Sequence, residues 1–351
     1  MIEEDGIKIF TFSTGNQKGP GKKLAGFYNP TWRLDRRIQI IFCEYAYERG
    51  ATKFLDGMAA TGIRGIRIKK MLRNVHVDIN DSNKKSYEII LRNVRENEID
   101  ADVTNEKFCS LLNRRKYDYI DLDPYGSPAK YIPCIFEGAR KKTFVSISAT
   151  DVATLSGVFK KACIKRYGAI PLKFHGAKEI GLRILLGYVA RIASIFDYSF
   201  KPILSYHYAH YFRVYGVVEK GAKKAERNIT AIGWFYWDDG WKVKEYEKPP
   251  SGKLAGPLWI KNLHEHDFIQ MLSKEEDKKI KSLAEKFIKE NEIATPYYES
   301  HRIAKEISKK QPRLHSLIEK LRQRGWRAAR THFAGDGFKT DAGYEEIKNY
   351  F

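Results

Sequence analysis

The hydrophobic positions in the first half of the chain predict an alternation of strands and helices. Short apolar runs have the length of buried strands, and the stretches between them carry apolar residues at helical spacing, as Ile38, Ile41 and Tyr45 do. Strands separated by helices in this way predict a parallel, doubly wound α/β sheet. The strands are expected at 53–55, 75–79, 117–122 and 143–148, and the helices at 33–49, 62–73 and 82–98, the last with Ser82 as its N-cap.

The second half of the chain begins with a long helix and two strand pairs. An amphipathic helix is expected at 179–196. Strands at 203–208 and 211–218 follow, and they are too close together for a helical crossover, so we expect them to be antiparallel. A hairpin of 229–237 with 241–246 is indicated by the turn Asp238-Asp239-Gly240.

Beyond a linker at 248–252, the pattern is basic and mostly helical. We therefore expect two domains: residues 1–250, an irregular N-terminal arm (1–30) followed by the sheet domain, and residues 251–351, a basic α+β domain. Helices that end in a β-ribbon suggest a winged-helix-like module in the second domain. Its helices are expected at 274–291, 299–310 and 314–325, and its strand pair at 326–333 and around 338.

The composition indicates which kind of partner the protein binds. The chain has 351 residues and a formal net charge of +20, from 63 Lys and Arg against 43 Asp and Glu. A hydrophobic fraction of 43% is ample for a packed core and excludes global disorder. No apolar run approaches the roughly 18 residues of a membrane span, and the acidic start of the chain lacks the layout of a signal peptide. We expect a cytoplasmic protein that binds a polyanion, nucleic acid above all, with no membrane contact and no obligate protein partner.

Cysteine and histidine spacings predict neither disulfides nor a metal site. Cys43, Cys109, Cys134 and Cys163 are scattered without paired spacing, which is typical of reduced thiols in the cytoplasm. The nine histidines do not stand at metal-ligand spacing from cysteines or acids, so no metal is expected.

Two motifs after the first strands indicate a nucleoside-containing cofactor. The segment from Asp56 to Gly65, rich in small residues, lets the backbone approach a ligand while the next helix offers free amide donors. Its glycine spacing differs from G-x-G-x-x-G, and a tight strand-to-helix turn is the alternative interpretation. Asp81 follows the second strand, where a carboxylate can accept both hydroxyls of a ribose, although an isolated Asp there is often a helix cap.

The most specific segment is Asp121-Leu122-Asp123-Pro124-Tyr125-Gly126, directly after a core strand. Asp123 can accept a hydrogen bond from an exocyclic amine, the carbonyl of Pro124 offers a second acceptor, and Tyr125 can stack on a planar base. Two acceptors on its protons localise the lone pair of an aryl amine for attack on an electrophilic methyl group. Asp121 and Asp123 lie on the same side of a strand and are expected to titrate as a pair. A simple turn is the alternative.

Aromatic and basic residues elsewhere admit two interpretations each. Phe27-Tyr28-Asn29-Pro30 could cover the crevice or pack the arm, and the aromatic stretch from Ser205 to Arg213 could stack bases, although sheet core is the commoner use. In the last third, basic residues interleaved with Trp326, His332 and Phe333 indicate contact with phosphates, or else a solvated face. These basic residues are Arg302, Lys305, Lys309, Lys310, Arg313, Arg322, Arg324, Arg327 and Arg330.

At Asp123-Pro124-Tyr125-Gly126-Ser127-Pro128 the sequence resembles the tRNA guanine-N2 dimethyltransferases, which modify guanosine 26 with S-adenosylmethionine. Four further segments resemble the family in the expected order along most of the chain, and the compact length and basic last third are similar to archaeal members. These segments are Phe27-Tyr28-Asn29-Pro30 with Arg36; Ala60–Arg67; Ala149-Thr150-Asp151; and Arg330–Phe333 with Lys339–Ala342.

The resemblance implies roles for particular residues and a fold. Asp123 would be the catalytic acceptor, with Phe27 and Tyr125 sandwiching the flipped guanine; Tyr125 replaces the commoner Phe. The fold implied is a Rossmann-like methyltransferase domain followed by a family-specific α+β tRNA-binding domain. The residues expected to hold S-adenosylmethionine are Arg36, Asp56, Arg64 and Asp81, with Glu106 and Phe108 near its adenine.

The sequence therefore predicts an enzyme that methylates the N2 amine of a tRNA guanosine at position 26, giving N2,N2-dimethylguanosine. Two alternatives stay open from the residues alone. One is another RNA amino-methyltransferase, acting on guanine-N2 of ribosomal RNA or on adenine-N6, and the other is a non-catalytic RNA-binding protein.

Overall fold

The computed structural model describes residues 1–12 and 25–351, so residues 13–24 of the expected arm lie outside the described residues. The chain divides into two compact units, each built from several segments. The first unit holds residues 1–150, 192–201 and 213–225, and the second holds 151–191, 202–212 and 226–351. This division differs from the boundary expected near residue 250, because segments well before that point already pack within the second unit.

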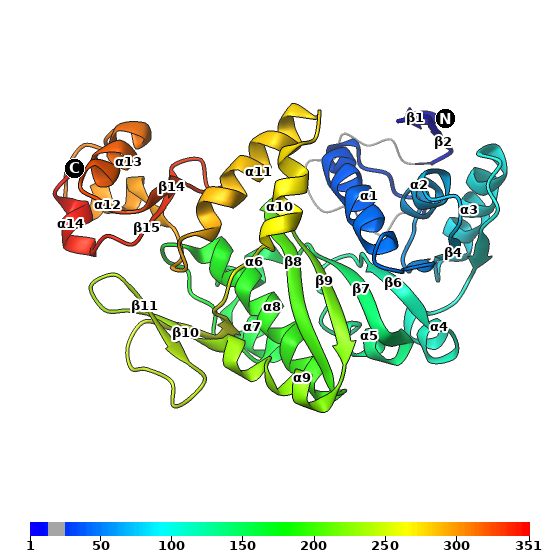
Figure 1. Ribbon diagram of the computed structural model, residues 1–351, viewed down its shortest axis with the longest axis horizontal. Helices are drawn as coiled ribbons and strands as arrows, with labels where there is room; N and C mark the ends of the chain where they lie inside the picture. Colours follow the sequence, from blue (N-terminus) through cyan, green and yellow to red (C-terminus); the bar gives the residue numbers. More distant parts are fainter. Residues whose placement is uncertain (13–24) are drawn as a thin grey trace. The chain divides into compact units, whose positions relative to one another are not determined.

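A seven-stranded sheet (Figure 1), most of which belongs to the first unit, has the order β5-β4-β3-β6-β7-β9-β8. Its first five strands are parallel. The last two are joined only by Ala209 and His210, and a two-residue connection makes them an antiparallel hairpin, as expected. The strands are β3 (Lys53–Asp56), β4 (His76–Asn80), β5 (Asp102–Thr104), β6 (Tyr117–Leu122), β7 (Ala139–Ala149), β8 (Tyr198–Tyr208) and β9 (Tyr211–Lys220).

The order of strands reverses beside β3, and this reversal positions the site. From β3 the chain runs outward through β4 to β5, then returns to add β6 and β7 on the other side. In open α/β sheets, ligands bind at the carboxyl ends of the strands that flank such a switch point. Phe54, Leu55, Ile120 and Leu122 in β3 and β6 are fully buried, as expected for strands covered on both faces.

Helices connect these strands; the first three lie where they were expected, and the last two were not expected. They are α1 (Arg33–Tyr47), α2 (Ile63–Met71), α3 (Lys84–Glu96), α4 (Phe108–Arg114) and α5 (Ile132–Gly138). The expected N-cap Ser82 was wrong by one residue: Asn83 caps α3, and its side chain accepts hydrogen bonds from the amides of Lys85 and Ser86 at 2.9 and 3.3 Å.

The prediction of four reduced thiols was also wrong. Cys109 on α4 and Cys134 on α5 form a disulfide, with their Cα atoms 5.1 Å apart. Their separation of 25 residues follows no pattern that a sequence would reveal, and only the packing of α4 against α5 brings the two sulfurs together. Cys43 and Cys163 are buried free thiols.

The start of the described chain forms a small hairpin of β1 (Ile2–Glu4) and β2 (Ile7–Ile9). Two amides on α3 hold its second strand: the side chain of Asn93 accepts from the amide of Phe10 at 2.7 Å, and that of Asn97 accepts from Lys8 at 3.1 Å. The arm is therefore attached to the sheet domain through α3.

The second unit combines helices with two small antiparallel sheets. One sheet has the order β11-β10-β12 and contains the hairpin turn predicted at Asp238-Asp239-Gly240, and the other has the order β13-β15-β14. Strand β12 and helix α10 were not expected. The strands are β10 (Ile232–Trp237), β11 (Trp241–Glu245), β12 (Leu254–Trp259), β13 (Tyr298–Glu299), β14 (Ala328–Arg330) and β15 (Gly337–Thr340). The helices from α6 on are α6 (Val152–Leu155), α7 (Lys160–Tyr167), α8 (Ala177–Ile195), α9 (Ala222–Glu226), α10 (His266–Ser273), α11 (Lys278–Asn291), α12 (Ser300–Glu306), α13 (Leu314–Gln323) and α14 (Tyr344–Lys348).

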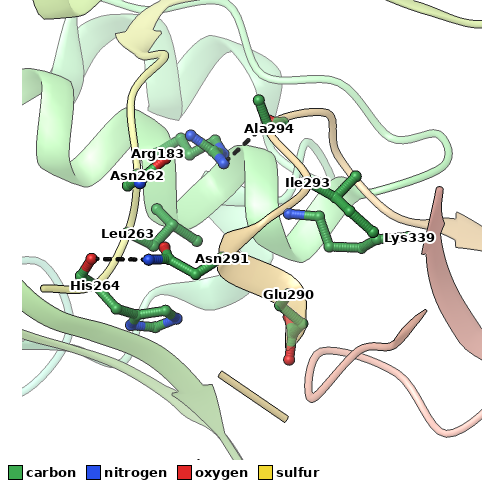
Figure 2. A pocket seen from close by; sticks show the side chains of 9 residues that line it. All are labelled: Arg183, Asn262, Leu263, His264, Glu290, Asn291, Ile293, Ala294 and Lys339. Carbon is green, nitrogen blue, oxygen red and sulfur yellow. Dashed lines mark hydrogen bonds between the residues drawn. The ribbon is translucent and has the colours of Figure 1, made fainter. Parts of the chain in front are cut away.

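A buried ion cluster ties the second unit together. The carboxylate of Glu179 on α8 accepts from Lys339 at 2.9 Å, from Arg183 at 3.0 Å and from the amide of Tyr297 at 3.2 Å. Arg183 and Lys339 also line a cavity of about 10 Å³ (Figure 2), which has room for about one water molecule. This part of the unit is therefore a packed core and offers no room for a substrate. In the described residues, we find no helix with the length and apolar character needed to cross a membrane.

Candidate active site

The residues singled out in the sequence come together where β3, β4 and β6 end. Asp56 closes β3, Asp81 follows β4, and Asp123 follows β6. Because parallel strands end at the same edge of a sheet, these side chains are brought to one edge, at the switch point between β3 and β6.

The turn after β3 is packed so closely that only glycine fits at its start. A Cβ on Gly57 would lie 2.5 Å from the ring of Phe108 and 2.7 Å from the carbonyl oxygen of Asp121. Asn80 holds this turn: its amide donates to the carbonyls of Gly57 and Glu106 at 3.0 and 3.1 Å. Phe108 is buried under the turn, while the carboxylate of Glu106 pairs with Arg114.

Asp81 holds the far side of the same turn. Its carboxylate accepts from the amide of Ala60 at 2.9 Å and from that of Asn83 at 2.8 Å. Ala60 adopts a left-handed conformation with φ of 52°, which a residue with a Cβ takes only where its surroundings hold it. Burial raises the pKa of Asp81, with the two amides opposing this shift. Since a carboxylate has about four acceptor positions, Asp81 can still accept hydrogen bonds from a ligand.

Asp123 lies against a buried arginine. Arg64 on α2 donates to Asp123 at 3.2 Å and to Asp35 of α1 at 2.6 Å, and it also bonds the side chain of Gln39. Burial raises the pKa of Asp123, while the charges of Arg64 and Arg213 work against this shift. The side chain of Asp123 is 18% exposed, so water can still reach it.

A second buried arginine, Arg213 on β9, was missed by sequence reasoning. It is fully buried, donates to Asp121 at 2.6 Å and also bonds the hydroxyl of Ser148. It lies in the aromatic stretch that the sequence left between sheet core and base stacking. The neighbouring Tyr206, Tyr211 and Phe212 belong to the hydrophobic core, because each is at most 1% exposed.

The segment after β6 presents an exposed aromatic ring. Pro124 is buried, and Gly126, with φ of 80°, is held by paired hydrogen bonds with Thr150 at 2.7 and 2.9 Å. Tyr125 is 47% exposed and meets Phe27 edge to face, with 6.0 Å between ring centroids. The structure thus brings together Phe27 and Tyr125, the two rings that the resemblance assigns to the flipped base. A base could enter between these rings only if they moved apart.

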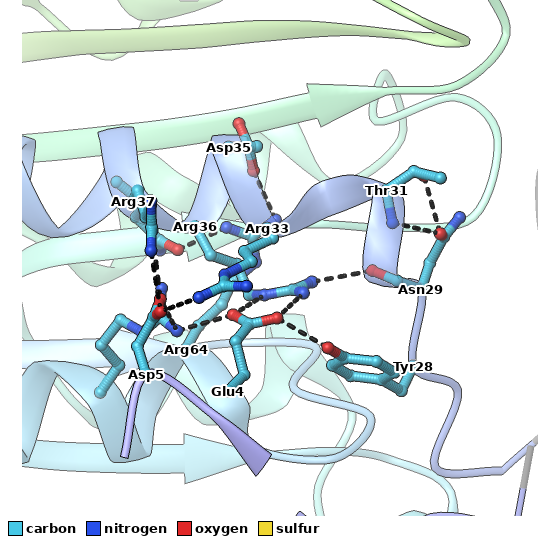
Figure 3. A network of polar contacts seen from close by, with 12 residues as sticks. Glu4, Asp5, Tyr28, Asn29, Thr31, Arg33, Asp35, Arg36, Arg37 and Arg64 are labelled. Atoms are coloured by element: carbon cyan, nitrogen blue, oxygen red, sulfur yellow. Dashed lines mark hydrogen bonds and ion pairs between the residues drawn. The ribbon is translucent and has the colours of Figure 1, made fainter. Parts of the chain in front are cut away.

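Arg36 binds different partners from Arg64, and both residues lie in the network of polar contacts in Figure 3. The guanidinium of Arg36 binds the carboxylate of Glu4 on the N-terminal hairpin through two N–H groups, one of them at 2.8 Å, and donates to the carbonyl of Asn29 at 3.2 Å. Glu4 also accepts from Tyr28 at 2.7 Å and from Arg67 at 2.6 Å. Arg36 therefore fixes the segment that carries Phe27 onto α1.

In the second unit, the structure shows which of the basic residues singled out between 302 and 330, and which of the aromatic residues among them, are exposed. Apart from the half-buried Arg302, all of these basic residues are exposed, as is Trp326. The expected contribution of His332 and Phe333 to an exposed surface was wrong. Phe333 is 1% exposed, and the ring of His332 is buried against the carboxylate of Glu290 at 2.9 Å.

A further group of possible ligands lies at the opposite end of the strands. His76 and Asp78 on β4 and Asp102 on β5 have atoms close enough to hold a metal ion. However, Arg115 already donates to Asp78 at 2.8 Å and lies 3.6 Å from Asp102, so a guanidinium compensates these carboxylates. We assign no metal to this group.

A sheet of this strand order, with carboxylates gathered at its switch point, defines the class of Rossmann-like methyltransferases. Within that class, the sequence model of the N2,N2-dimethylguanosine tRNA methyltransferase family matches residues 15–351, and the chain belongs to this family. The fold and the family predicted from the sequence are thereby confirmed.

Relatives and a solved structure match over nearly the whole chain. The tRNA (guanine(26)-N(2))-dimethyltransferase of Thermococcus kodakarensis is 32% identical over 92% of this chain and 93% of the relative. The protein of the same name from Methanocaldococcus jannaschii is 33% identical, with coverages of 99% and 97%. The structure of Trm1 from Pyrococcus horikoshii with S-adenosyl-L-methionine aligns with a TM-score of 0.86 at 29% identity, covering 95% of this chain and 98% of that one.

Proposed function

We propose that this protein transfers methyl groups from S-adenosylmethionine to the exocyclic N2 amine of guanosine 26 in tRNA, giving N2,N2-dimethylguanosine. The family and the names of the relatives support this activity. The observation that carries the proposal is the position of Asp123, a half-buried carboxylate beside the exposed ring of Tyr125 at the switch point of the sheet.

The residues of the crevice fit S-adenosylmethionine. Asp81 keeps acceptor positions for ribose hydroxyls, and Phe108 gives the turn at Gly57 an apolar wall suited to an adenine. Asp56 and Asp121 each carry a buried carboxylate oxygen without a hydrogen-bond partner among the described residues, and an excess of negative charge favours a sulfonium cation. In this proposal Arg36 acts indirectly, because its guanidinium holds Glu4 and Asn29.

The exposed aromatic pair supplies the means to hold a flipped base. Extracting a stacked guanine from folded RNA costs a few kcal/mol. Stacking on an aromatic side chain is worth about 1–3 kcal/mol per base, so Tyr125 and Phe27 together can offset much of this cost. Separation of the two rings, which now touch edge to face, would accompany entry of the base.

Asp123 would direct the chemistry. S-adenosylmethionine, when bound, supplies an electrophilic methyl group and leaves as a neutral thioether. The carboxylate of Asp123 and the carbonyl of Pro124 accept the N–H groups of the guanine amine and orient its lone pair. As the new N–C bond forms, the amine loses one proton to Asp123, which can return it to water because its side chain is 18% exposed.

The exposed basic residues of the second unit would bind the tRNA backbone. Lys305, Lys309, Lys310 and Arg313 form an exposed basic run around the end of α12, and phosphate contacts of this kind supply most of the sequence-independent affinity for nucleic acid. With tRNA as substrate, we place the enzyme in the cytoplasm.

Mass spectrometry of nucleosides from a tRNA transcript treated with the protein and S-adenosylmethionine tests the proposal. We expect N2-methylguanosine and then N2,N2-dimethylguanosine, and neither product in a matched transcript that carries adenosine at position 26. Methylation at another guanosine or at adenine would replace the proposed substrate. Tight RNA binding without any methylated product would point to a binding protein.

A further inference from the structure

Two aspartates of neighbouring strands face each other under the proposed active site. Asp56 at the end of β3 and Asp121 in β6 are register partners in the parallel ladder. Paired residues of adjacent parallel strands point to the same side of the sheet, and their backbones are about 4.8 Å apart. The exposed fractions of Asp56 and Asp121 are 1% and 0%, so the two carboxyl groups are neighbours out of reach of water.

Each of these carboxyl groups is satisfied on one oxygen only. Asp56 accepts from the amide of Gly65 at 2.9 Å through Oδ2, and Asp121 accepts from Arg213 at 2.6 Å through Oδ1. The other oxygens, Oδ1 of Asp56 and Oδ2 of Asp121, are buried and have no hydrogen-bond partner among the described residues. A proton on one of them would remove one of these two neighbouring buried charges, and a hydrogen bond between the two side chains would then satisfy both oxygens.

The surrounding charges show which aspartate holds that proton. The charges that act on Asp56 are those of Arg64 on α2, Asp123 after β6 and Asp121 itself. Arg213 of β9 forms an ion pair with Asp121, and Asp35 of α1 is paired with both arginines. We call this group the carboxylate cluster; it comprises Asp35, Asp56, Asp121 and Asp123 with Arg64 and Arg213. Four carboxylates against two guanidiniums leave two negative charges uncompensated when all are ionised, which is unfavourable in a buried place.

Asp56 is the member of the carboxylate cluster with the weakest compensation. Asp121 has Arg213 at 2.6 Å, Asp35 has Arg64 at 2.6 Å, and Asp123 has Arg64 at 3.2 Å. Among the described residues, Asp56 accepts a hydrogen bond from the backbone amide of Gly65, and Arg64 acts on it through its charge without an ion pair. Burial and then the charge of Asp121 raise the pKa of Asp56, which agrees with this assignment.

We propose that Asp56 carries a proton at neutral pH, donates it in a hydrogen bond to Asp121, and as a neutral acid keeps Asp123 ionised. The inference rests on the proposed function, in which Asp123 accepts the guanine amine. Asp56 acts as a positioning residue through its charge state. If it ionised, its negative charge would add to that of Asp121 and favour protonation of Asp123, and Asp123 would then no longer accept a proton from the substrate.

The pH profile of methyl transfer separates this role from a structural one. In Asp56→Asn the side chain is neutral at every pH, as the protonated acid is at neutral pH, so the readout is the shape of the pH profile of kcat at saturating S-adenosylmethionine and not its absolute value. In the wild type, ionisation of Asp56 should make kcat decline at alkaline pH. This decline should be absent from Asp56→Asn. The matched variant Asp121→Asn leaves Arg213 without its carboxylate and should lose at least about tenfold. A folded Asp56→Asn with an unchanged alkaline decline would overturn the proposal.

Infrared spectroscopy of the free protein tests the proton without RNA or cofactor. A protonated carboxyl group has a carbonyl stretching band that a carboxylate lacks. We expect the wild type to show such a band at neutral pH, Asp56→Asn to lose it, and Asp123→Asn to keep it. A band that persists in Asp56→Asn, or that is absent from the wild type, would contradict the proposal. Because this measurement needs no catalysis, failure of the wild type to methylate tRNA would count against the proposed function alone.

Discussion

At the scale of single residues, Arg64 links the crevice wall to the proposed acceptor. It is 7% exposed and binds Asp35 at 2.6 Å and Asp123 at 3.2 Å, so it fixes the orientation of Asp123. The charges of Asp35, Asp123 and Asp121 hold its pKa well above the usual value even though burial alone would lower it. Arg64 therefore stays charged, and changes of charge with pH inside the carboxylate cluster come from its carboxyl groups.

The first prediction concerns Asp123. Asp123→Ala should lower the rate of methyl transfer by about 10²–10⁴-fold, the usual contribution of a positioned proton acceptor. Binding of S-adenosylmethionine, measured by calorimetry, should change little because Asp81 and the turn at Gly57 are untouched. Asp100→Asn, an exposed acid before β5, serves as the control and should behave as wild type. Turnover of Asp123→Ala at the control's rate would remove Asp123 from the mechanism.

Asp123 can be found from the sequence, whereas the buried partners of Arg64 and Arg213 cannot, and the reason is physical. Asp123 stands in a local pattern of strand, proline and aromatic ring that has chemical meaning by itself. Arg213 is 92 residues from its partner Asp121, and nothing in its aromatic strand distinguishes an arginine that points into the protein from one that points to solvent. Buried ion pairs between distant segments depend on the topology, so the carboxylate cluster could be described only once the sheet was known.

At the scale of elements, the N-terminal hairpin is fastened by charge. Glu4 is 2% exposed and is bound by Arg36, Arg67 and Tyr28. Burial alone would raise the pKa of Glu4, but hydrogen bonding to Arg36 and the arginine charges lower it overall. The hairpin in turn supports the segment from Tyr28 to Asn29, next to the proposed base-stacking ring of Phe27.

Glu4→Gln should therefore destabilise the protein at neutral pH, by up to about 3–5 kcal/mol, because Arg36 stays buried without a carboxylate while Arg67 keeps Asp5 at 3.0 Å. Since the folded pKa of Glu4 is below its unfolded value, this stabilisation is complete above the unfolded pKa and is lost as the pH falls through the folded value. Denaturant unfolding of wild type and variant between pH 7 and acid pH should show the gap closing. Glu3→Gln changes an exposed neighbour and should leave stability unchanged.

The disulfide between α4 and α5 gives a third prediction. It closes a loop of 25 residues, for which the chain-entropy relation gives a stabilisation of about 3.5 kcal/mol. Adding dithiothreitol should lower the melting temperature of the wild type, whereas the double variant Cys109→Ser, Cys134→Ser should melt at the same temperature with and without it. An equal response of both proteins would show that the bond makes no contribution.

Local signals decide which elements a sequence predicts well. The turn at Asp238-Asp239-Gly240 and the strands of the sheet core were evident because their residues favour these structures whatever surrounds them. The short strands β5 and β12 were missed, since each owes its extended form to pairing with a neighbour in the sheet. The same holds for the disulfide, which depends on how α4 packs against α5.

At the scale of the whole molecule, the charge of +20 is spread unevenly between ionic clusters and exposed side chains. Arg183 and Lys339 are used inside the second unit to compensate Glu179, and Arg327 pairs with Asp341 at 2.7 Å. Charge inside such pairs attracts RNA weakly. Sequence counts cannot separate these two uses of arginine and lysine, because paired and exposed basic residues occur in the same segments of the chain.

The fourth prediction uses this distinction. Replacing Lys309, Lys310 and Arg313 together by alanine should weaken tRNA binding and reduce the slope of log affinity against log salt, by up to about one for each phosphate that the variant no longer binds. Unfolding stability should not change because all three side chains are exposed. Filter binding at several salt concentrations measures the slope, with Lys223→Ala on α9 as the control. A slope identical to wild type would exclude these residues from the interface.

The carboxylate cluster also bears on the design of inhibitors. With one proton shared, its four acids and two guanidiniums carry a net charge of about −1 in a place that water hardly reaches, and a ligand with one fixed positive charge makes it neutral. Compounds that carry a permanent cation, such as a quaternary ammonium, where a sulfonium would be should therefore be held more tightly than uncharged thioethers of the same shape. Because the site is buried, this preference should persist at salt concentrations that abolish attraction to the protein surface.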